Sequence, residues 1–225
     1  MPSFIEIRNL TKSYGDHLVI DQLSLDIKEG EIVVFQGPSG IGKSTFLRCL
    51  TYLEPFEKGS VRIGNVMLRA GMDEDRDRAA ILALREQVGY VFQFFQLFPH
   101  LTVLENLTIG PVRVLEVPEE QARDEAIKLL KRVGLEQKAG AYPAALSGGQ
   151  QQRVAIARAL AMQPRAILFD EPTASLDPTM KKEIIQVIEE IRHDHLTMLV
   201  VTHEPEFVKR IATRIVTFGA FGRIS

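Results

Sequence analysis

A glycine-rich loop, set between an apolar run and a helical segment, restricts the possible folds of this chain more than its other features. The loop covers residues 37–44, GPSGIGKS, and comes shortly after the apolar run 32–35, IVVF. Four consecutive apolar residues are typical of a strand that is covered on both faces. A helix is predicted from about Ser44 to Tyr52. Together with the apolar runs 166–169 and 197–201, this order of elements predicts an α/β protein with a parallel sheet.

The loop fits the pattern G-x-x-x-x-G-K-[ST], whose residue types suit the binding of phosphate groups. Glycines allow positive φ and let the backbone approach an anion closely. Backbone N–H groups and the positive end of the following helix then stabilise the phosphate charge. Lys43 is predicted to reach the β- and γ-phosphates, and the hydroxyl of Ser44 to bind Mg²⁺. The loop therefore predicts a nucleoside-triphosphate site, because a chance turn before a helix does not require the Lys-Ser pair.

Two carboxylates, Asp170 and Glu171, follow the apolar run 166–169, AILF. In open α/β sheets, ligands bind outside the carboxyl ends of the strands. Asp170 is suited to hold Mg²⁺, a cation that prefers oxygen ligands and retains water. By strand alternation, Glu171 is expected to point toward the γ-phosphate, as a general base or as the residue that orients the attacking water. Taken alone, such a pair is often only a helix cap, so this interpretation depends on the phosphate loop.

A second glycine-bearing turn, LSGGQ at residues 146–150, opens another predicted helix with the sequence QQRVAIARAL. A helix that begins at such a turn is a second candidate anion site. One nucleotide cannot use both sites if they lie far apart on one chain. Two copies arranged head to tail remove this difficulty, because each site then joins the phosphate loop of one copy to Ser147 and the glycines of the other.

The combination of GPSGIGKST, LSGGQ and ILFDEPTASLD resembles the ATP-binding subunits of ABC transporters over nearly the whole chain. The resemblance implies hydrolysis of ATP with Mg²⁺ by a head-to-tail homodimer that acts on integral membrane subunits. By position, Tyr14 is similar to the aromatic that stacks on adenine, and Gln93 to the glutamine that touches Mg²⁺ and the attacking water. Asp177 is similar to the aspartate that organises the dimer interface, and His203 to the histidine that contacts the γ-phosphate. Without these motifs, Tyr14 and His203 are typical of a surface tyrosine and a loop histidine.

The predicted site residues fall into three groups, which the resemblance and the motifs define together. Catalytic roles are expected for Lys43, Gln93, Glu171 and His203. The expected ligands of Mg²⁺ are Ser44, Gln93 and Asp170. The expected nucleotide contacts are Tyr14, Gly37, Pro38, Ser39, Gly40, Gly42, Lys43, Ser44, Thr45, Ser147, Gly148, Gly149, Gln150 and Asp177.

The fold that this resemblance implies is a single ABC ATPase domain over residues 1–225, of the α/β class. It consists of a P-loop NTPase core with a mostly parallel sheet, an N-terminal antiparallel β subdomain and an inserted α-helical subdomain. The core with the β subdomain is expected at 1–94 and 160–225, and the helical subdomain at about 95–159. The first thirty residues are predicted to form short strands. A helix is predicted to start at Pro118 and to end before Gly134.

Composition argues against several other classes of protein. The net charge of −2 is unlike that of a nucleic-acid-binding protein, which usually carries a basic excess. The one cysteine, Cys49, excludes an internal disulfide and is expected to be buried. The other histidines show no metal-ligand grouping and are expected to be structural or solvated: His17, His100, His193 and His195. No secretory signal is visible and no apolar run approaches the ~20 residues that span a bilayer, so we expect membrane association at the cytoplasmic face through partners, without direct insertion.

A finer resemblance concerns the transported solute. Residues 91–106, VFQFFQLFPHLTVLEN, and the stretch 142–145, YPAA, resemble polar amino-acid importers and predict import of such solutes. The aromatic residues just after Gln93 suit the binding of a helix of the membrane partner, with core packing as the alternative. Gln36, the order Ala174-Ser175 and the ending 205–225 depart from the usual importer pattern. Two other functions therefore stay open, an ABC ATPase of lipoprotein release or cell division and a nucleotide-gated dimerisation switch.

Overall fold

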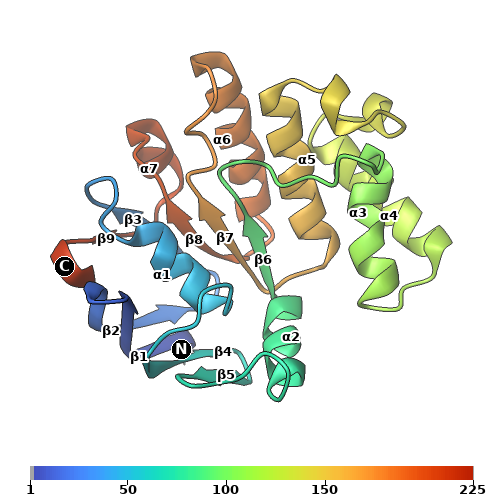
Figure 1. The fold of residues 1–225 in the computed structure, drawn as a ribbon. Helices are drawn as coiled ribbons and strands as arrows, with labels where there is room; N and C mark the ends of the chain where they lie inside the picture. Colours follow the sequence, from blue (N-terminus) through green and yellow to red (C-terminus); the bar gives the residue numbers. More distant parts are fainter. Residues whose placement is uncertain (1–2, 225) are drawn as a thin grey trace.

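The computed structural model describes residues 3–224, so the predicted domain bounds at 1 and 225 lie outside the described residues. The N-terminal part forms an antiparallel sheet in the order β2-β1-β4-β5 (Figure 1), with β1 Ser3–Tyr14, β2 His17–Lys28, β4 Lys58–Ile63 and β5 Val66–Arg69. The prediction of short strands in this part was wrong, because β1 and β2 each have 12 residues. They pair from end to end because a tight turn at Gly15, with φ of 57°, reverses the chain.

A second sheet is parallel throughout and has the order β6-β7-β8-β3-β9. Its strands are β3 Ile32–Gln36, β6 Val88–Val91, β7 Ala166–Asp170, β8 Thr197–Val201 and β9 Arg214–Thr217. β9 was not predicted, because it lies at the edge of the sheet and only one of its four side chains is buried. The carboxyl ends of β3, β7 and β8 meet at one edge of the sheet, where an α/β protein places its ligands.

Helices connect the strands and cover them. Their bounds are α1 Lys43–Leu50, α2 Arg78–Gln87, α3 Val103–Arg113, α4 Glu119–Arg132, α5 Gly148–Ala161, α6 Pro178–Arg192 and α7 Pro205–Ile211. α4 follows Pro118 and ends before Gly134, as predicted. α1 begins and ends somewhat earlier than predicted, since Tyr52 turns away with φ of 53°. The charged stretch 73–78 is typical of a solvated loop or a helix start, and α2 begins at its last residue, whereas α7 was not predicted.

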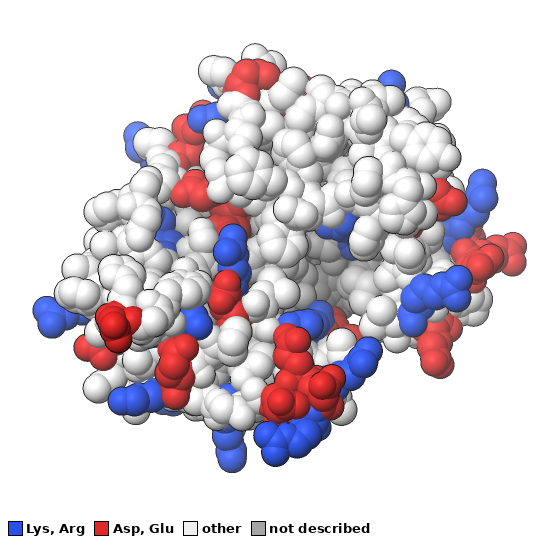
Figure 2. All heavy atoms as spheres, in the orientation of Figure 1, with Lys and Arg blue, Asp and Glu red and all other residues white. Residues whose placement is uncertain are grey.

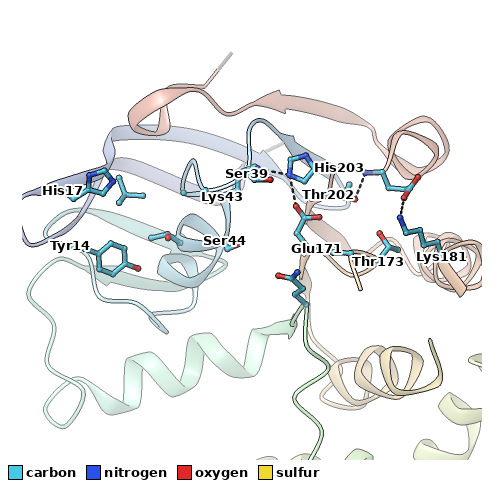
Figure 3. A pocket seen from close by; sticks show the side chains of 17 residues that line it. Tyr14, His17, Ser39, Lys43, Ser44, Glu171, Thr173, Lys181, Thr202 and His203 are labelled. Carbon is cyan, nitrogen blue, oxygen red and sulfur yellow. Dashed lines mark hydrogen bonds and ion pairs between the residues drawn. The ribbon is translucent and has the colours of Figure 1, made fainter. Parts of the chain in front are cut away.

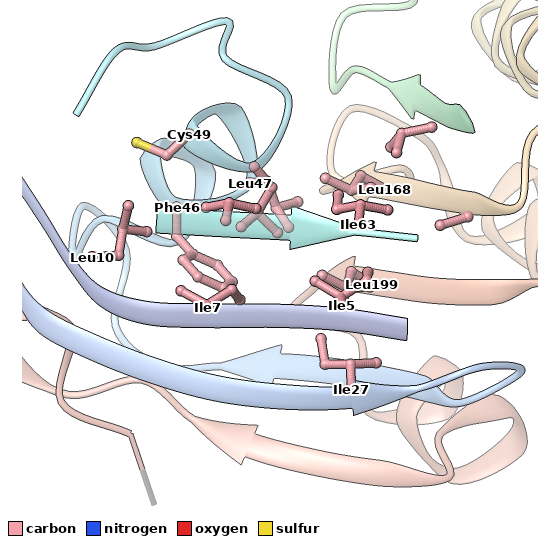
Figure 4. Close-up of a cluster of buried hydrophobic side chains, with 14 of the residues drawn as sticks. Ile5, Ile7, Leu10, Ile27, Phe46, Leu47, Cys49, Ile63, Leu168 and Leu199 are labelled. Carbon is pink, nitrogen blue, oxygen red and sulfur yellow. The ribbon is translucent and has the colours of Figure 1, made fainter. Parts of the chain in front are cut away.

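The parallel sheet is buried on both faces, as its apolar runs predict. Along β3, Val33 and Phe35 face a hydrophobic core shared with the antiparallel sheet and α1 (Figure 4). Ile32 and Val34 face a second core, which helices α3 to α7 cover. Cys49 is fully buried in the first core, as expected, and this burial raises the pKa of its thiol to about 12. The two cores fix β3, and with it the loop that follows, between two packed layers.

Within residues 3–224, none of the helices has the length and apolar character needed to cross a membrane. On the face shown in Figure 2, Lys and Arg are interspersed with Asp and Glu, and the upper part of the face carries few charges. A hollow on this face lies between α3 and β6. It coincides with a groove of about 350 Å³, whose lining includes Tyr90, Phe92, Phe98 and Met162.

Candidate functional site

A cavity of about 720 Å³ opens at the carboxyl ends of β3, β7 and β8. Its walls come from the β1–β2 turn, the loop before α1 and the segments that follow β7 and β8. Tyr14 and His17 lie at one end and Lys181 at the other, with Lys43, Glu171 and His203 between them (Figure 3). These segments are far apart in the sequence. They meet at the cavity because their strands end at the same edge of one sheet.

The glycines of the loop before α1 are required by backbone conformation and by space. Gly37 and Gly42 have φ of 151° and 104°, which L side chains rarely adopt. A Cβ at Gly37 would lie 2.3 Å from the carbonyl oxygen of Phe218, and one at Gly42 would lie 2.5 Å from Cγ1 of Val19. The loop therefore packs closely against the protein behind it, and its other side faces the cavity.

Lys43, the first residue of α1, is held inside the site by the loop itself. Its side chain is almost fully buried, and Nζ donates to the carbonyl oxygens of Gly37 at 2.7 Å and Pro38 at 2.8 Å. Nζ also lies 3.3 Å from His203 Nε2. Burial lowers the pKa of the Lys43 ammonium, and the charges of Glu171 and Asp170 oppose this shift. The site thus contains a cation that few water molecules reach and that is suited to an anionic ligand.

Asp170, the last residue of β7, is fixed by two hydroxyl groups. Ser44 Oγ donates to Asp170 Oδ1 at 2.6 Å, and the phenol of Tyr90 donates to Oδ2 at 3.0 Å. Within residues 3–224, no group of three or more His, Cys, Asp or Glu side chains is arranged to hold a metal ion. The hydroxyl of Ser44 and the carboxylate of Asp170 nevertheless fit Mg²⁺, which accepts few protein oxygens and completes its shell with water and phosphate oxygens.

Glu171 and His203 face each other inside the cavity. Glu171 Oε1 lies 3.1 Å from His203 Nε2. β7 ends at Asp170, and Glu171 turns off the strand with φ of 49° while its N–H donates to the carbonyl oxygen of Val201. Strand alternation, the reason used for the orientation of Glu171, therefore does not apply. Burial raises the pKa of the Glu171 carboxyl above its usual value, although His203 and Lys43 oppose the shift.

Comparison with known proteins identifies the family to which this site belongs. The profile of the ABC transporter family matches residues 20–174. The glutamate/aspartate import ATP-binding protein GltL of Escherichia coli (strain K12) is 48% identical over 94% of this chain and 86% of its own length. The glutamine transport ATP-binding protein GlnQ of Geobacillus stearothermophilus is 47% identical over 98% of this chain and 88% of its own length. The chain belongs to the ABC transporter family.

A solved structure supports the same assignment. The dimeric ATP-binding cassette MJ0796, in a post-hydrolysis state bound to ADP and Pi, has a TM-score of 0.85 and 37% identity, covering 98% of this chain and 96% of its own. The predicted family and the predicted fold class are therefore confirmed, and the chain is a nucleotide-binding ABC cassette.

Most of the predicted site residues come together in this ABC cassette. The cavity is lined by Tyr14, Ser39, Gly40, Gly42, Lys43, Ser44, Thr45, Gln93, Glu171 and His203. Gly37, Pro38 and Asp170 do not line it but contact Lys43 or Ser44, which do. Tyr14 is 46% exposed, as a stacking surface must be, and Lys12 Nζ lies 4.8 Å from the centre of its ring.

The LSGGQ turn and Asp177 do not line the cavity of their own chain. Ser147 caps α5, where its hydroxyl accepts from the N–H of Gln150 and the Gln150 side chain accepts from the N–H of Ser147. Gly148 and Gly149 form the first turn of α5. Asp177 caps α6 by accepting from the N–H groups of Thr179 and Met180. Both motifs thus form helix N-termini outside the cavity that the phosphate loop lines.

Several residues that line the cavity were missed by the sequence analysis: His17, Thr173, Lys181, Thr202 and Glu204. Thr202 and Glu204 flank His203 in the sequence, so their position beside a predicted site residue could have indicated that they line the cavity. His17 was expected to be structural or solvated; it is exposed and lies beside Tyr14 because the two pair across the β1–β2 turn. No sequence pattern predicts that Lys181 lines the cavity, because its position depends on how α6 packs.

Proposed function

We propose that this chain is the ATP-binding and ATP-hydrolysing subunit of an ABC transporter that imports polar amino acids. The observation that carries the proposal is the convergence of Lys43, Glu171 and His203 in one cavity, with Tyr14 at its far end. A nucleotide laid along the cavity has its base at Tyr14 and its phosphates at Lys43. GltL and GlnQ, whose names specify amino-acid import, support the class of solute.

In this proposal the loop before α1 binds the phosphates. Backbone N–H groups and hydroxyls come from Ser39, Gly40, Gly42, Ser44 and Thr45, and the N-terminus of α1 adds its positive dipole. Gly37 and Pro38 contribute through their carbonyl oxygens, which hold Lys43. Lys43 exchanges its bonds to the loop carbonyls for bonds to the β- and γ-phosphates. Tyr14 stacks on adenine, because an exposed aromatic face attracts a base without needing a particular hydrogen bond.

Ser44, Asp170 and Gln93 are the residues that would hold Mg²⁺. The ion, when bound, neutralises charge on the phosphates and positions them for in-line attack. Glu171 accepts the proton of the attacking water, and its raised pKa suits a general base near neutral pH. His203 Nε2, which faces Glu171 Oε1 in the structure, donates its single N–H to the γ-phosphate when ATP is bound. Gln93, which lines the same cavity as Glu171 and His203, orients the attacking water.

The active form in this proposal is a head-to-tail homodimer. Ser147, Gly148, Gly149 and Gln150 lie outside their own cavity and supply a helix N-terminus to the nucleotide of the other copy. Asp177 orders the loop that meets the partner chain. The dimeric cassette MJ0796 supports this arrangement. Two ATP molecules close the dimer, and hydrolysis reopens it.

The membrane subunits bind near the groove beside β6. Phe94 and Phe98 are 65% and 42% exposed, and exposed aromatics are typical anchors of protein interfaces. Arg158 of α5 supports this segment, since Nη1 donates to the carbonyl oxygen of Gln96 and the guanidinium lies 5.5 Å from the centre of the Phe98 ring. We place the chain at the cytoplasmic face of the membrane, held by these subunits. The division into core (1–94 and 160–225) and helical subdomain (95–159) belongs to the same proposal.

The decisive experiment compares ATP hydrolysis by the parent with that by Glu171→Gln, together with the size of each in Mg-ATP. We expect turnover by the parent, and an inactive Glu171→Gln variant that elutes as a dimer. Glu190→Gln, an exposed change on α6, is the matched control and should behave like the parent. Full activity of Glu171→Gln contradicts the role of Glu171. Dimers without turnover in the parent favour a nucleotide-gated switch.

The solute is tested by transport. The chain is reconstituted with its membrane and solute-binding subunits, and ATP-dependent uptake of labelled glutamate, glutamine and arginine is compared with uptake of a sugar. Uptake confined to the amino acids supports the proposal. Assembly with a complex that moves no small solute favours lipoprotein release or cell division.

A further inference from the structure

A lysine and a glutamate form an ion pair at the end of the cavity opposite Tyr14 (Figure 3). Lys181 Nζ lies 2.9 Å from Glu204 Oε2. The two side chains are 32% and 24% exposed, and both line the cavity. The pair joins α6 to the segment between β8 and α7, within the wall that also carries His203.

The helices that contain these two residues do not account for the pair. Lys181 lies near the N-terminus of α6, where the positive end of the helix dipole disfavours a cation. Glu204 occupies the N-cap position of α7, yet its side chain makes no capping hydrogen bond there. The carboxylate bonds to Lys181 instead. Neither side chain thus stabilises the helix that contains it. This indicates that the pair serves to connect α6 with the segment before α7.

The pair connects two parts of the proposed mechanism. On one side, the N–H of Lys181 donates to the carbonyl oxygen of Asp177 at 2.9 Å, so Lys181 moves with the Asp177 segment. On the other side, Glu204 directly follows His203, and its N–H donates to Thr202 Oγ1 at 3.1 Å. One ion pair thus joins the first turn of α6 to the segment that carries His203.

We propose that Lys181 and Glu204 are positioning residues, which hold His203 beside Glu171 and link its placement to the Asp177 segment. The inference rests on the proposed function, in which Asp177 lies at the dimer interface and His203 contacts the γ-phosphate. In this proposal the pair acts through His203 and does not itself bind the nucleotide or the attacking water. Breaking it frees the His203 segment, so hydrolysis slows while ATP still binds.

Steady-state kinetics of Lys181→Gln and Glu204→Gln test this inference. We expect each change to lower kcat about threefold to tenfold and to leave KM for ATP within about twofold, as for a partly exposed ion pair that acts on the reacting state. The double variant Lys181→Glu/Glu204→Lys restores the attraction with exchanged charges and should recover most of kcat. Lys181→Arg keeps the charge and should also stay near the parent, which provides the same test if the exchanged pair fails to fold.

Lys128→Gln is the matched control, because it removes a lysine from a 2.7 Å pair with Glu125 on the exposed side of α4. It should leave kcat and KM unchanged. A lysine that bound phosphate directly would give the opposite pattern: KM would rise in Lys181→Gln, and the exchanged pair would not recover. That result overturns the inference.

Failure of this inference is distinguishable from failure of the proposed function. A parent that does not hydrolyse Mg-ATP contradicts the proposed function. An active parent whose two glutamine variants match it contradicts the positioning role alone. Circular dichroism melting of each variant shows whether it is folded.

Discussion

Glu171 Oε1 and His203 Nε2 lie 3.1 Å apart, although one residue follows β7 and the other follows β8. The contact exists because β7 and β8 are neighbours in the parallel sheet and end at the same edge. The N–H of Glu171 donates to the carbonyl oxygen of Val201, which fixes the turn after β7 to the end of β8. A carboxylate and an imidazole are thus held at one point of the cavity by the backbone, and such preorganisation of polar groups lowers the cost of reaching a transition state.

Replacing His203 with alanine should separate turnover from binding. Without the imidazole, Glu171 loses its partner and the γ-phosphate loses a donor, so kcat should fall about 100-fold. The dissociation constant for ATP should stay within about threefold, because Lys43 and the glycine loop remain. His193→Ala, at the far end of α6, is the control. Equal losses in the two variants, or a loss explained entirely by weaker binding, would contradict the role of His203.

The raised pKa of Glu171 predicts how stability depends on pH. The Glu171 carboxyl binds its proton more tightly in the folded protein than an ordinary glutamate does. The stability that this group contributes is therefore present below the usual pKa of 4.5 and is lost as pH rises through the raised pKa. Glu171→Gln imitates the protonated form. Without nucleotide, this variant should melt about 1–3 °C above the parent at pH 8, and the difference should vanish near pH 4.

The exposed Glu190→Gln variant serves as the control for this measurement and should follow the parent at both pH values. A melting temperature of Glu171→Gln at or below that of the parent at pH 8 would show that the attraction to Lys43 and His203 outweighs burial.

The phosphate loop and the cores were predictable because they obey strong local rules. Gly37 and Gly42 need positive φ, and the run 32–35 needs two apolar environments, so each has a clear sequence pattern. The long β1–β2 hairpin was harder to predict. Its side chains alternate irregularly, since bulges shift the register at several points.

Long-range contacts account for the residues that the sequence did not reveal. The pairing of Lys181 with Glu204 depends on the packing of α6 beside α7, which no local pattern encodes. The bond from Tyr90 to Asp170 likewise depends on β6 lying next to β7. The roles proposed for Tyr14 and His203 came from the family resemblance, because a single tyrosine or histidine has many other uses.

Replacing Tyr14 tests the stacking of adenine. Tyr14→Ala should weaken ATP binding about tenfold, the loss expected for one base stacked on one aromatic ring. Tyr14→Phe keeps the ring and should bind like the parent, which separates stacking from hydrogen bonding by the phenol. Binding is measured by titration with a fluorescent ATP analogue in EDTA, where no turnover occurs. An equal loss for inorganic triphosphate, which has no base, would argue for a structural role of Tyr14.

The two glycines of the LSGGQ turn should differ in their tolerance of alanine. A Cβ at Gly149 would lie 2.9 Å from Cγ and 3.0 Å from Cβ of Met180, atoms near the backbone of α6 that cannot easily move away. A Cβ at Gly148 would meet Leu176 at 3.4 Å, an ordinary contact. Gly149→Ala should therefore lower the free energy of unfolding by about 1–3 kcal/mol, and the melting temperature by about 3–10 °C.

Gly148→Ala is the matched control and should be neutral or slightly stabilising, since alanine is the better helix former. Thermal melting of both variants without nucleotide isolates packing from any effect on the dimer. If both changes destabilise the chain equally, the close approach of α5 to Met180 is not the cause. If only Gly149→Ala does so, this glycine has a packing role within its own chain, in addition to its proposed contact with the nucleotide of the partner.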